Sequence, residues 1–222
     1  MLYLVSTPIG NLEEMSPRAI RVLSQSPLVL VEKRSDCLKL LHHFGIRSKE
    51  VIQYDDASHK RIISTILKKL ETIDAAYITS AGTPGVSDPG NRLVQAVRAA
   101  GIPISVVSGP SALTAAIAAS GLPSPYLFVG FLEKKHSALQ TALRNAASVK
   151  ATLVFYESTH RIIKTLSALK HLLPNEQIFV SKELTKLHET LLYGTPIEIL
   201  DIFAKNSALT RGEFVVMVPP AR

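Results

Sequence analysis

Short apolar segments alternate with amphipathic ones along nearly the whole chain, and this alternation restricts the fold more than any other feature. Segments rich in branched and aromatic residues predict strands at 2–6, 27–32, 50–53, 74–79, 104–107, 126–130, 151–156, 177–181 and 213–218. The intervening segments predict helices at 16–25, 35–43, 57–71, 90–100, 111–120, 136–147, 158–172 and 195–204. Such alternation is typical of parallel sheets covered by helices, so the sequence predicts an α/β fold.

The pattern restarts in the middle of the chain, after "GLPSPY" at 121–126. The segment "HETLLYGT" at 188–195 then adds an expected antiparallel strand. A chain of 222 residues, 46% of them apolar, has enough core-forming residues for two compact units. We therefore predict two α/β domains, 1–112 and 113–222.

Composition excludes several classes of protein. No apolar run reaches the roughly 18–20 residues of a membrane span. The start, "MLYLVSTPIGN", lacks the basic region and cleavage site of a secretion signal, so a cytoplasmic location and no membrane partner are expected. A single cysteine, Cys37, excludes an internal disulfide and a cysteine-rich zinc site, and no metal is expected. The net charge of +7 permits RNA binding through phosphate contacts, but no block of consecutive basic residues makes that signal specific.

Polar, glycine-rich loops follow several of the predicted strands. In the first half these are "STPIGNL" (6–12), Glu32, "SAGTPGVSDPG" (80–90) and "SGPSAL" (108–113); in the second they are "YEST" (156–159) and "SKELTK" (181–186). Each loop alone is compatible with ordinary turn chemistry. Ligands of α/β sheets bind at the carboxyl ends of strands, however, so loops at several such ends predict a binding site. Neither a P-loop nor a GxGxxG motif opening a helix is present.

The motifs occur in an order that resembles a known family. The segments are "LYLVSTPIGNLEEMSPRAIRVL", "SAGTPGVSDPGNRLV", "SGPSALTAAIAASGLP", "FVGFLEKK", "FYESTHRIIKTL", "KELTKLHE" and "GEFVVMV". They resemble the ribosomal RNA small subunit 2′-O-ribose (cytidine) methyltransferase family, within the tetrapyrrole methylase superfamily. The resemblance covers nearly the whole chain. It implies two α/β domains with S-adenosylmethionine (SAM) in the cleft between them, a homodimer, and small-subunit rRNA or the 30S ribosomal subunit as the partner.

The resemblance also implies the residues of the site. Those matching the SAM-contacting motifs are Pro8, Ile9, Gly10, Thr83, Pro84, Gly85, Val86, Asp88, Pro110, Ser111, Ala112, Tyr156, Glu157, Leu184 and Glu213. The implied reaction is methyl transfer to the 2′-hydroxyl of a cytidine. A ribose hydroxyl is a poor nucleophile, so a base or a cation that stabilises the alkoxide should help. The candidates for that role, which the sequence does not rank, are Glu32, Asp88, Lys182 and Glu183.

The sequence departs from the family pattern in the first domain. The usual AEDTR is "VEKRS" at 31–35, which keeps only Glu32 in place, and the usual SDAGTPG is "TSAGTPG", which puts Ser80 at an aspartate position. A His/Glu/Asn-rich segment is replaced by "YDDASHK" at 54–60. Because these changes alter the local field, we hypothesise that SAM binding is retained while the acceptor or the efficiency of transfer differs. The alternatives are a methyltransferase of the same fold acting on a tetrapyrrole or other small molecule, and a non-catalytic SAM- or RNA-binding protein.

Overall fold

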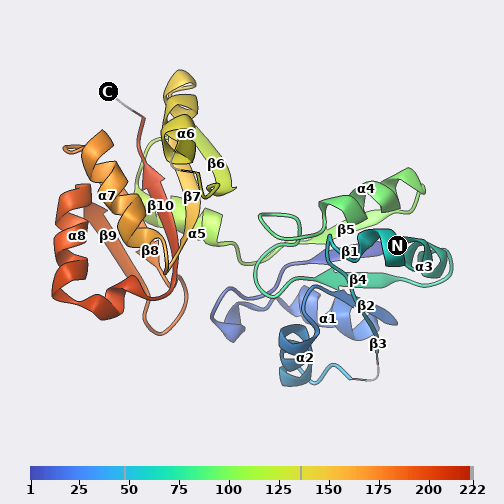
Figure 1. Ribbon diagram of the computed structural model, residues 1–222. Helices are drawn as coiled ribbons and strands as arrows, with labels where there is room; N and C mark the ends of the chain where they lie inside the picture. The colour runs from blue at the N-terminus through green and yellow to red at the C-terminus, as the bar shows by residue number, and fades with distance from the viewer. Residues whose placement is uncertain (48, 136, 221–222) are drawn as a thin grey trace. The chain divides into compact units, whose positions relative to one another are not determined.

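The computed structural model describes residues 1–47, 49–135 and 137–220 (Figure 1). The chain divides into two compact units, Met1–Ser111 and Ala112–Arg222, each built around its own five-stranded sheet. Within the described ranges, none of the helices has the length and apolarity needed to cross a lipid bilayer.

Unit 1 contains a fully parallel sheet with strand order β3-β2-β4-β1-β5. Its strands are β1 (Leu2–Val5), β2 (Leu28–Val31), β3 (Glu50–Gln53), β4 (Ala75–Ile78) and β5 (Ile104–Val107). Because all five strands run in one direction, their carboxyl ends lie at one edge of the sheet. We call this edge, with the loops that leave it, the carboxyl edge of unit 1.

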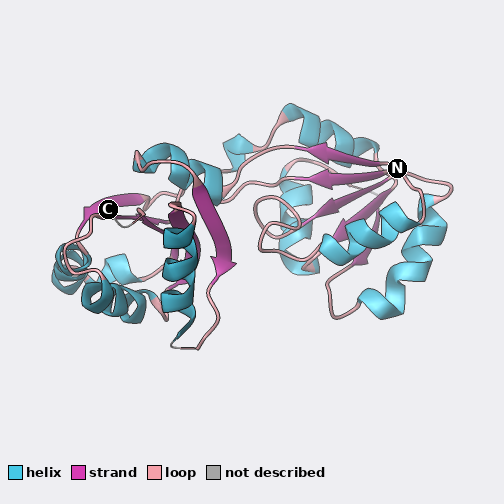
Figure 2. Cartoon of the chain, turned by 90° about the horizontal axis from the view of Figure 1, so that it is seen from above, coloured by secondary structure: helices cyan, strands magenta, loops and turns pink. Residues whose placement is uncertain are grey.

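Helices cover both faces of this sheet (Figure 2). Side chains alternate between the faces, as β4 illustrates: Ile78 packs with α1 and α2, whereas Tyr77 packs with α3 and α4. Both faces are therefore apolar, which explains the continuous apolar runs in the sequence. The helices are α1 (Pro17–Gln25), α2 (Arg34–His43), α3 (His59–Leu70) and α4 (Asn91–Ala99), with a 3-10 turn η1 (Leu12–Glu14) before α1.

Unit 2 contains a mixed sheet with strand order β6-β7-β10-β8-β9. The strands are β6 (Tyr126–Phe131), β7 (Thr152–Ser158), β8 (Ile178–Lys182), β9 (Thr190–Gly194) and β10 (Glu213–Val218). β6 and β7 are parallel, and β9 pairs antiparallel with β8 as the sequence predicts. The expectation of parallel sheets is wrong for β10, which lies between β7 and β8 and is antiparallel to both.

A hydrophobic cluster packs one face of the unit 2 sheet against α6 (Ser137–Ser148), α7 (Ile162–Leu172) and α8 (Pro196–Lys205). The apolar helix α5 (Ala112–Ser120) contacts β10, and a 3-10 turn η2 (Ser207–Thr210) precedes that strand. The predicted helix start at 158 is wrong, because Ser158 still pairs with Glu213 in the ladder and α7 begins at Ile162.

Candidate functional site

The loops after β1, β4 and β5 meet at the carboxyl edge of unit 1. Thr7 and Gly82 exchange two backbone hydrogen bonds of 2.9 and 3.0 Å, which joins loop 6–12 to loop 80–90. The hydroxyls of Ser6 and Thr83 are also hydrogen-bonded, at 2.9 Å. After β5, Gly109 packs against Ser6 so closely that a Cβ atom at Gly109 would lie 3.0 Å from the Ser6 Cβ. Three sequence segments that the motifs predicted to act together are therefore held side by side.

Glycine is required in loop 80–90 for both conformation and space. Gly90 has φ +139°, and a Cβ atom there would lie 3.0 Å from the ring of Tyr77 and 3.3 Å from the amide nitrogen of Gly85. Ser87 adopts φ 63°, a left-handed conformation that side chains rarely take. Strained backbone of this kind clusters at ligand sites, where the surrounding structure enforces it.

Glu32, directly after β2, is anchored by Ser80, one of the residues at which the sequence departs from the family pattern. Its Oε2 accepts hydrogen bonds from the amide and the hydroxyl of Ser80, at 3.0 and 2.9 Å. Among the described residues no hydrogen bond reaches Oε1, and the side chain is half-buried. An aspartate at position 80 would place a second carboxylate beside Glu32. Serine instead supplies a donor and leaves one oriented carboxylate with a free oxygen.

Tyr77 links the sheet to the end of loop 80–90. Its hydroxyl donates a hydrogen bond of 3.2 Å to the carbonyl oxygen of Pro89. Burial, and after it the charge of Glu32, raises the pKa of Tyr77, with smaller contributions from Asp56 and Asp88. The phenol therefore stays protonated and keeps its hydrogen bond, while carboxylates from three separate segments lie within electrostatic range of it.

The segment after β3 holds a tyrosine–histidine pair that the sequence analysis missed. Tyr54 is 0% exposed, and its hydroxyl lies 2.7 Å from Nδ1 of His59, the first residue of α3. Burial raises the pKa of Tyr54 to about 12. The signal in the sequence was a tyrosine ending an apolar strand, followed five residues later by a histidine at a helix start.

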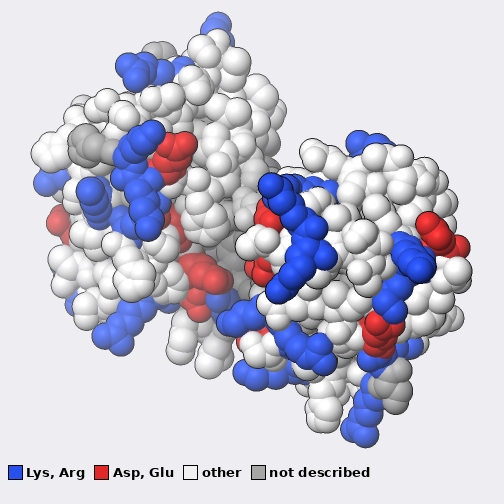
Figure 3. Space-filling view, turned by 45° about the vertical axis from the view of Figure 1, so that its right-hand side comes forward, with Lys and Arg blue, Asp and Glu red and all other residues white. Residues whose placement is uncertain are grey.

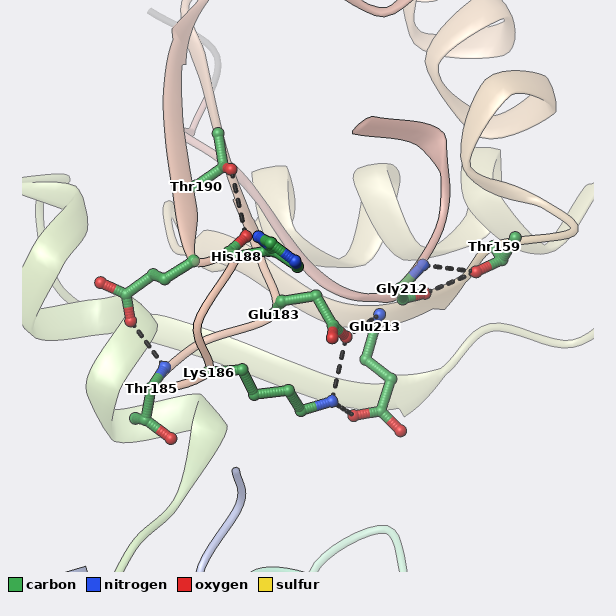
Figure 4. A network of polar contacts seen from close by, with 9 residues as sticks. Thr159, Glu183, Thr185, Lys186, His188, Thr190, Gly212 and Glu213 are labelled. Atoms are coloured by element: carbon green, nitrogen blue, oxygen red, sulfur yellow. Dashed lines mark hydrogen bonds and ion pairs between the residues drawn. The ribbon is translucent and has the colours of Figure 1, made fainter. Parts of the chain in front are cut away.

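In unit 2, a charged network joins the carboxyl end of β8 to the amino end of β10, which lie side by side because the two strands are antiparallel. Lys186 donates to the carboxylates of Glu183 and Glu213, at 2.9 Å each (Figure 4). The amide of Glu213 donates to Glu183 at 2.9 Å, and the amide of Glu183 donates to the carbonyl oxygen of Glu213 at 2.9 Å. Across the network, Gly212 and Thr159 exchange two further hydrogen bonds. The structure thus brings together Glu183 and Glu213, which the motifs placed in one site.

This network predicts an acid-sensitive stability. Burial raises the pKa of Glu183, but hydrogen bonds from the Glu213 amide and from Lys186 outweigh burial, so the pKa is lowered overall. A lowered carboxyl pKa stabilises the fold above the unfolded-state value and loses that contribution as pH falls through the folded value. We expect the free energy of unfolding of wild type, measured with urea, to fall below about pH 4.5. In Glu183→Gln this fall should be smaller. An unchanged pH dependence in the variant would contradict this. Glu189→Gln, in the same loop, is the control.

The end of β8 and the loop that follows it combine backbone strain with unsatisfied hydroxyls. Glu183 and Thr185 have φ 51° and 66°. Two hydroxyl oxygens here, Ser181 Oγ and Thr185 Oγ1, are buried and have no hydrogen-bond partner among the described residues. Buried polar atoms are nearly always satisfied, so such orphans at a strained loop indicate a ligand-binding segment.

Two predicted site residues of unit 2 are turned toward its interior. The carboxylate of Glu157 accepts hydrogen bonds from Thr165 Oγ1 at 2.7 Å and from the Ser158 amide at 2.8 Å, and lies 3.5 Å from Nε of Arg161. Lys182 is 5% exposed, and it shares the face of Ile178 and Val180 that the helices cover. No hydrogen bond or ion pair joins its ammonium to any residue in the described part of the chain.

The other predicted site residues lie mostly in the loops that follow the strands. Loops 6–12 and 80–90 carry Pro8, Ile9, Gly10 and Thr83 to Asp88 on the carboxyl edge of unit 1, and Pro110 and Ser111 follow β5. Tyr156 lies in β7 opposite Val215 of β10, Leu184 lies in the strained loop, and Ala112 begins α5. Lysine and arginine side chains are spread over the visible surface of both units, with acidic side chains among them (Figure 3). On this face the positive charge therefore forms no single patch.

Comparison with known proteins gives a consistent result. The family model for Tetrapyrrole (Corrin/Porphyrin) Methylases matches residues 1–200. The chain is 44% identical to "Ribosomal RNA small subunit methyltransferase I" of Coprothermobacter proteolyticus, covering 100% of this chain and 99% of that protein. It is 40% identical to the protein of the same name from Xylella fastidiosa, covering 99% and 81%.

Two solved structures share the fold at low sequence identity. Diphthine synthase aligns with a TM-score of 0.75 at 12% identity, covering 99% of this chain and 89% of that chain. The methyltransferase CobJ aligns with a TM-score of 0.71 at 19% identity, covering 99% and 94%. The family match over residues 1–200 and the relatives at 44% and 40% identity show that the chain belongs to the tetrapyrrole (corrin/porphyrin) methylase family.

Proposed function

We propose that this protein transfers a methyl group from SAM to the 2′-hydroxyl of a cytidine in small-subunit rRNA. Family membership makes it a SAM-dependent methyltransferase, and relatives at 44% and 40% identity are named for small-subunit rRNA. The observation that carries the proposal is the carboxyl edge of unit 1. There, loops 6–12 and 80–90 and Gly109 are held together beside a carboxylate that is anchored at one oxygen and free at the other.

The residues at the carboxyl edge suit a ligand of SAM's chemistry. When bound, SAM supplies an electrophilic methyl group on a positively charged sulfur. Glycines 82, 85 and 90 all have positive φ, so the backbone of loop 80–90 turns tightly and its polar groups can lie close to a nucleoside and an amino-acid tail. The unsatisfied hydroxyls of Ser181 and Thr185 offer further hydrogen bonds in unit 2, next to Leu184. We propose that these segments, with the motif residues named above, hold SAM.

Among the candidate acid–base residues, Glu32 fits the role of base best. Its Oε2 is held by Ser80, so Oε1 is oriented and free to accept the proton of a ribose hydroxyl. Glu183 is less suited, because hydrogen bonds from the Glu213 amide and from Lys186 lower its pKa, which makes its carboxylate a weaker proton acceptor. Lys182 lies on the helix-covered face of its sheet, and Asp88 lies further along loop 80–90. We therefore assign the base to Glu32.

The proposed homodimer and the proposed cytoplasmic location can each be tested by one measurement. The homodimer implied by the family resemblance predicts sedimentation at twice the 24.1 kDa chain mass. Fractionation of the source cells would test the cytoplasmic location expected from the sequence.

Methyl transfer from labelled SAM to 30S subunits that lack the native mark tests the proposed function. We expect label in a cytidine 2′-O-methyl group, identified by nuclease digestion and mass spectrometry. Transfer only to a porphyrinoid would favour a small-molecule methyltransferase of the same fold. Binding of SAM and 30S without transfer would favour a non-catalytic binding protein. Either outcome would overturn the proposal.

A further inference from the structure

The Tyr54–His59 pair lies on the carboxyl edge of unit 1 but belongs to none of the SAM-binding motifs. Tyr54 follows β3, which occupies the position next to β2 in the sheet. Adjacent strands are about 5 Å apart, so the pair leaves the edge one strand away from Glu32 and two from loop 80–90. It is therefore on the side of Glu32 that faces away from the loops assigned to SAM, and this is the side on which we place the acceptor nucleotide.

The local structure fixes where the imidazole sits. Asp55 accepts a 2.7 Å hydrogen bond from the Ser58 amide, and the Ser58 hydroxyl donates to the Asp55 carbonyl oxygen at 3.0 Å. Arg92 of α4 donates to the carbonyl oxygen of Asp56 at 3.3 Å. The Tyr54 ring packs edge-on against Tyr77 with centroids 5.6 Å apart. The start of α3 is thus held from its own loop, from α4 and from β4, so His59 has a defined position.

The phenol also determines which nitrogen of His59 carries a hydrogen. The pKa of Tyr54 is raised to about 12 by burial, so its hydroxyl keeps its proton at neutral pH. A buried hydroxyl hydrogen needs an acceptor, and among the residues that the structure describes Nδ1 of His59, at 2.7 Å, is in place to accept it. If Nδ1 accepts, the neutral imidazole carries its hydrogen on Nε2. The charges that act on the phenol are those of Asp56 and Asp55, which raise its pKa, and that of Arg92, which lowers it.

We infer that His59 is a substrate-positioning residue that donates a hydrogen bond from Nε2 to a ribose–phosphate oxygen of the acceptor nucleotide. Tyr54 keeps the imidazole in the donor tautomer. This assignment rests on the proposed function, because it requires an RNA acceptor. It leaves proton removal to Glu32, whose carboxylate would take up the hydroxyl proton. The ribose oxygen would bond to the methyl carbon, and the electron pair of the broken carbon–sulfur bond would stay on sulfur.

Three variants and two kinds of readout test the inference. We expect His59→Ala to raise KM for 30S roughly tenfold, as loss of one hydrogen bond would, with the SAM dissociation constant unchanged. His59→Gln, whose amide retains a donor, should recover most of that loss. Nitrogen-15 NMR of the imidazole should show Nε2 protonated and Nδ1 unprotonated in wild type. In Tyr54→Phe, which keeps the packed ring, the two tautomers should mix.

The outcomes separate this inference from the proposed function. A hydrogen on Nδ1 in the neutral wild-type imidazole, or an unchanged KM in His59→Ala, would overturn the donor assignment. So would a fall in kcat accompanied by loss of the acid limb of the pH–rate profile, since that result would make His59 the base. If wild type binds 30S without methylating it, the proposed function fails. The NMR spectra and the 30S affinities of wild type and His59→Ala then still decide the inference.

Discussion

Replacement of Glu32 by glutamine is expected to lower kcat for methyl transfer by about 10²–10⁴-fold, the usual contribution of a general base. The amide has the same shape, and its oxygen can still accept both hydrogen bonds from Ser80, but it cannot take up a proton at neutral pH. The SAM dissociation constant and the melting temperature should therefore stay close to wild type. Single-turnover kinetics with 30S would measure the rate of transfer, calorimetric titration the SAM dissociation constant, and thermal unfolding the melting temperature.

A second variant examines how Glu32 is held. Ser80→Ala removes the hydroxyl donor at 2.9 Å but keeps the amide donor at 3.0 Å, so the carboxylate remains ionisable yet loses half of its anchoring. We expect kcat to fall less than in Glu32→Gln, with SAM affinity again unchanged. If Glu32→Gln retained more than half of the wild-type kcat, Glu32 would not be the base.

Substitution of Gly90 by alanine should weaken SAM binding by about tenfold or more. Non-glycine residues at unusual positive φ cost about 1–3 kcal/mol, and Gly90 has φ +139°. The added Cβ would also press on the Tyr77 ring and on the Gly85 amide, so the strain would be relieved by moving loop 80–90. Calorimetric titration of SAM into the folded variant would test the prediction.

Gly101→Ala is the matched control. Gly101 follows α4 with φ +69°, and a Cβ atom there would meet nothing within 4 Å. This change should lower the free energy of unfolding by about 1–2 kcal/mol through backbone strain alone, with no effect on SAM affinity. Equal losses of SAM affinity in the two variants would show that lowered stability, and not the position of loop 80–90, controls binding.

Most of the fold could be predicted because local signals and tertiary packing agree in this chain. Strands apolar throughout, such as Leu28–Val31, are buried on both faces, and helices begin at capping residues such as Ser16, which accepts from the Ala19 amide. The direction of β10 could not be predicted, because an apolar strand reads the same in either orientation. The end of β7 was misplaced for a similar reason: pairing of Ser158 with Glu213 is a contact between residues distant in sequence.

The site could be predicted as a set of loops but not as a set of interactions. Motif order identified loops 6–12, 80–90 and 108–113, which the structure holds together through contacts such as Thr7–Gly82. The sequence marked Ser80 as a departure, but its contact with Glu32 depends on β2 and β4 being neighbours. Lys182 shows the converse. Strand alternation, visible in the sequence, puts it on the face of Ile178 and Val180, but which face the helices cover is settled only by the packed structure.

The central place of β10 in unit 2 has a consequence for the order in which the chain can fold during translation. All strands of unit 1 lie within the first 111 residues, so its sheet can close while the rest of the chain is still being synthesised. In unit 2 the last strand, Glu213–Val218, separates β7 from β8. Until those residues leave the ribosome, β6-β7 and β8-β9 are two incomplete ribbons with open edges. Unit 2 is therefore the part of the nascent chain that most needs protection from aggregation.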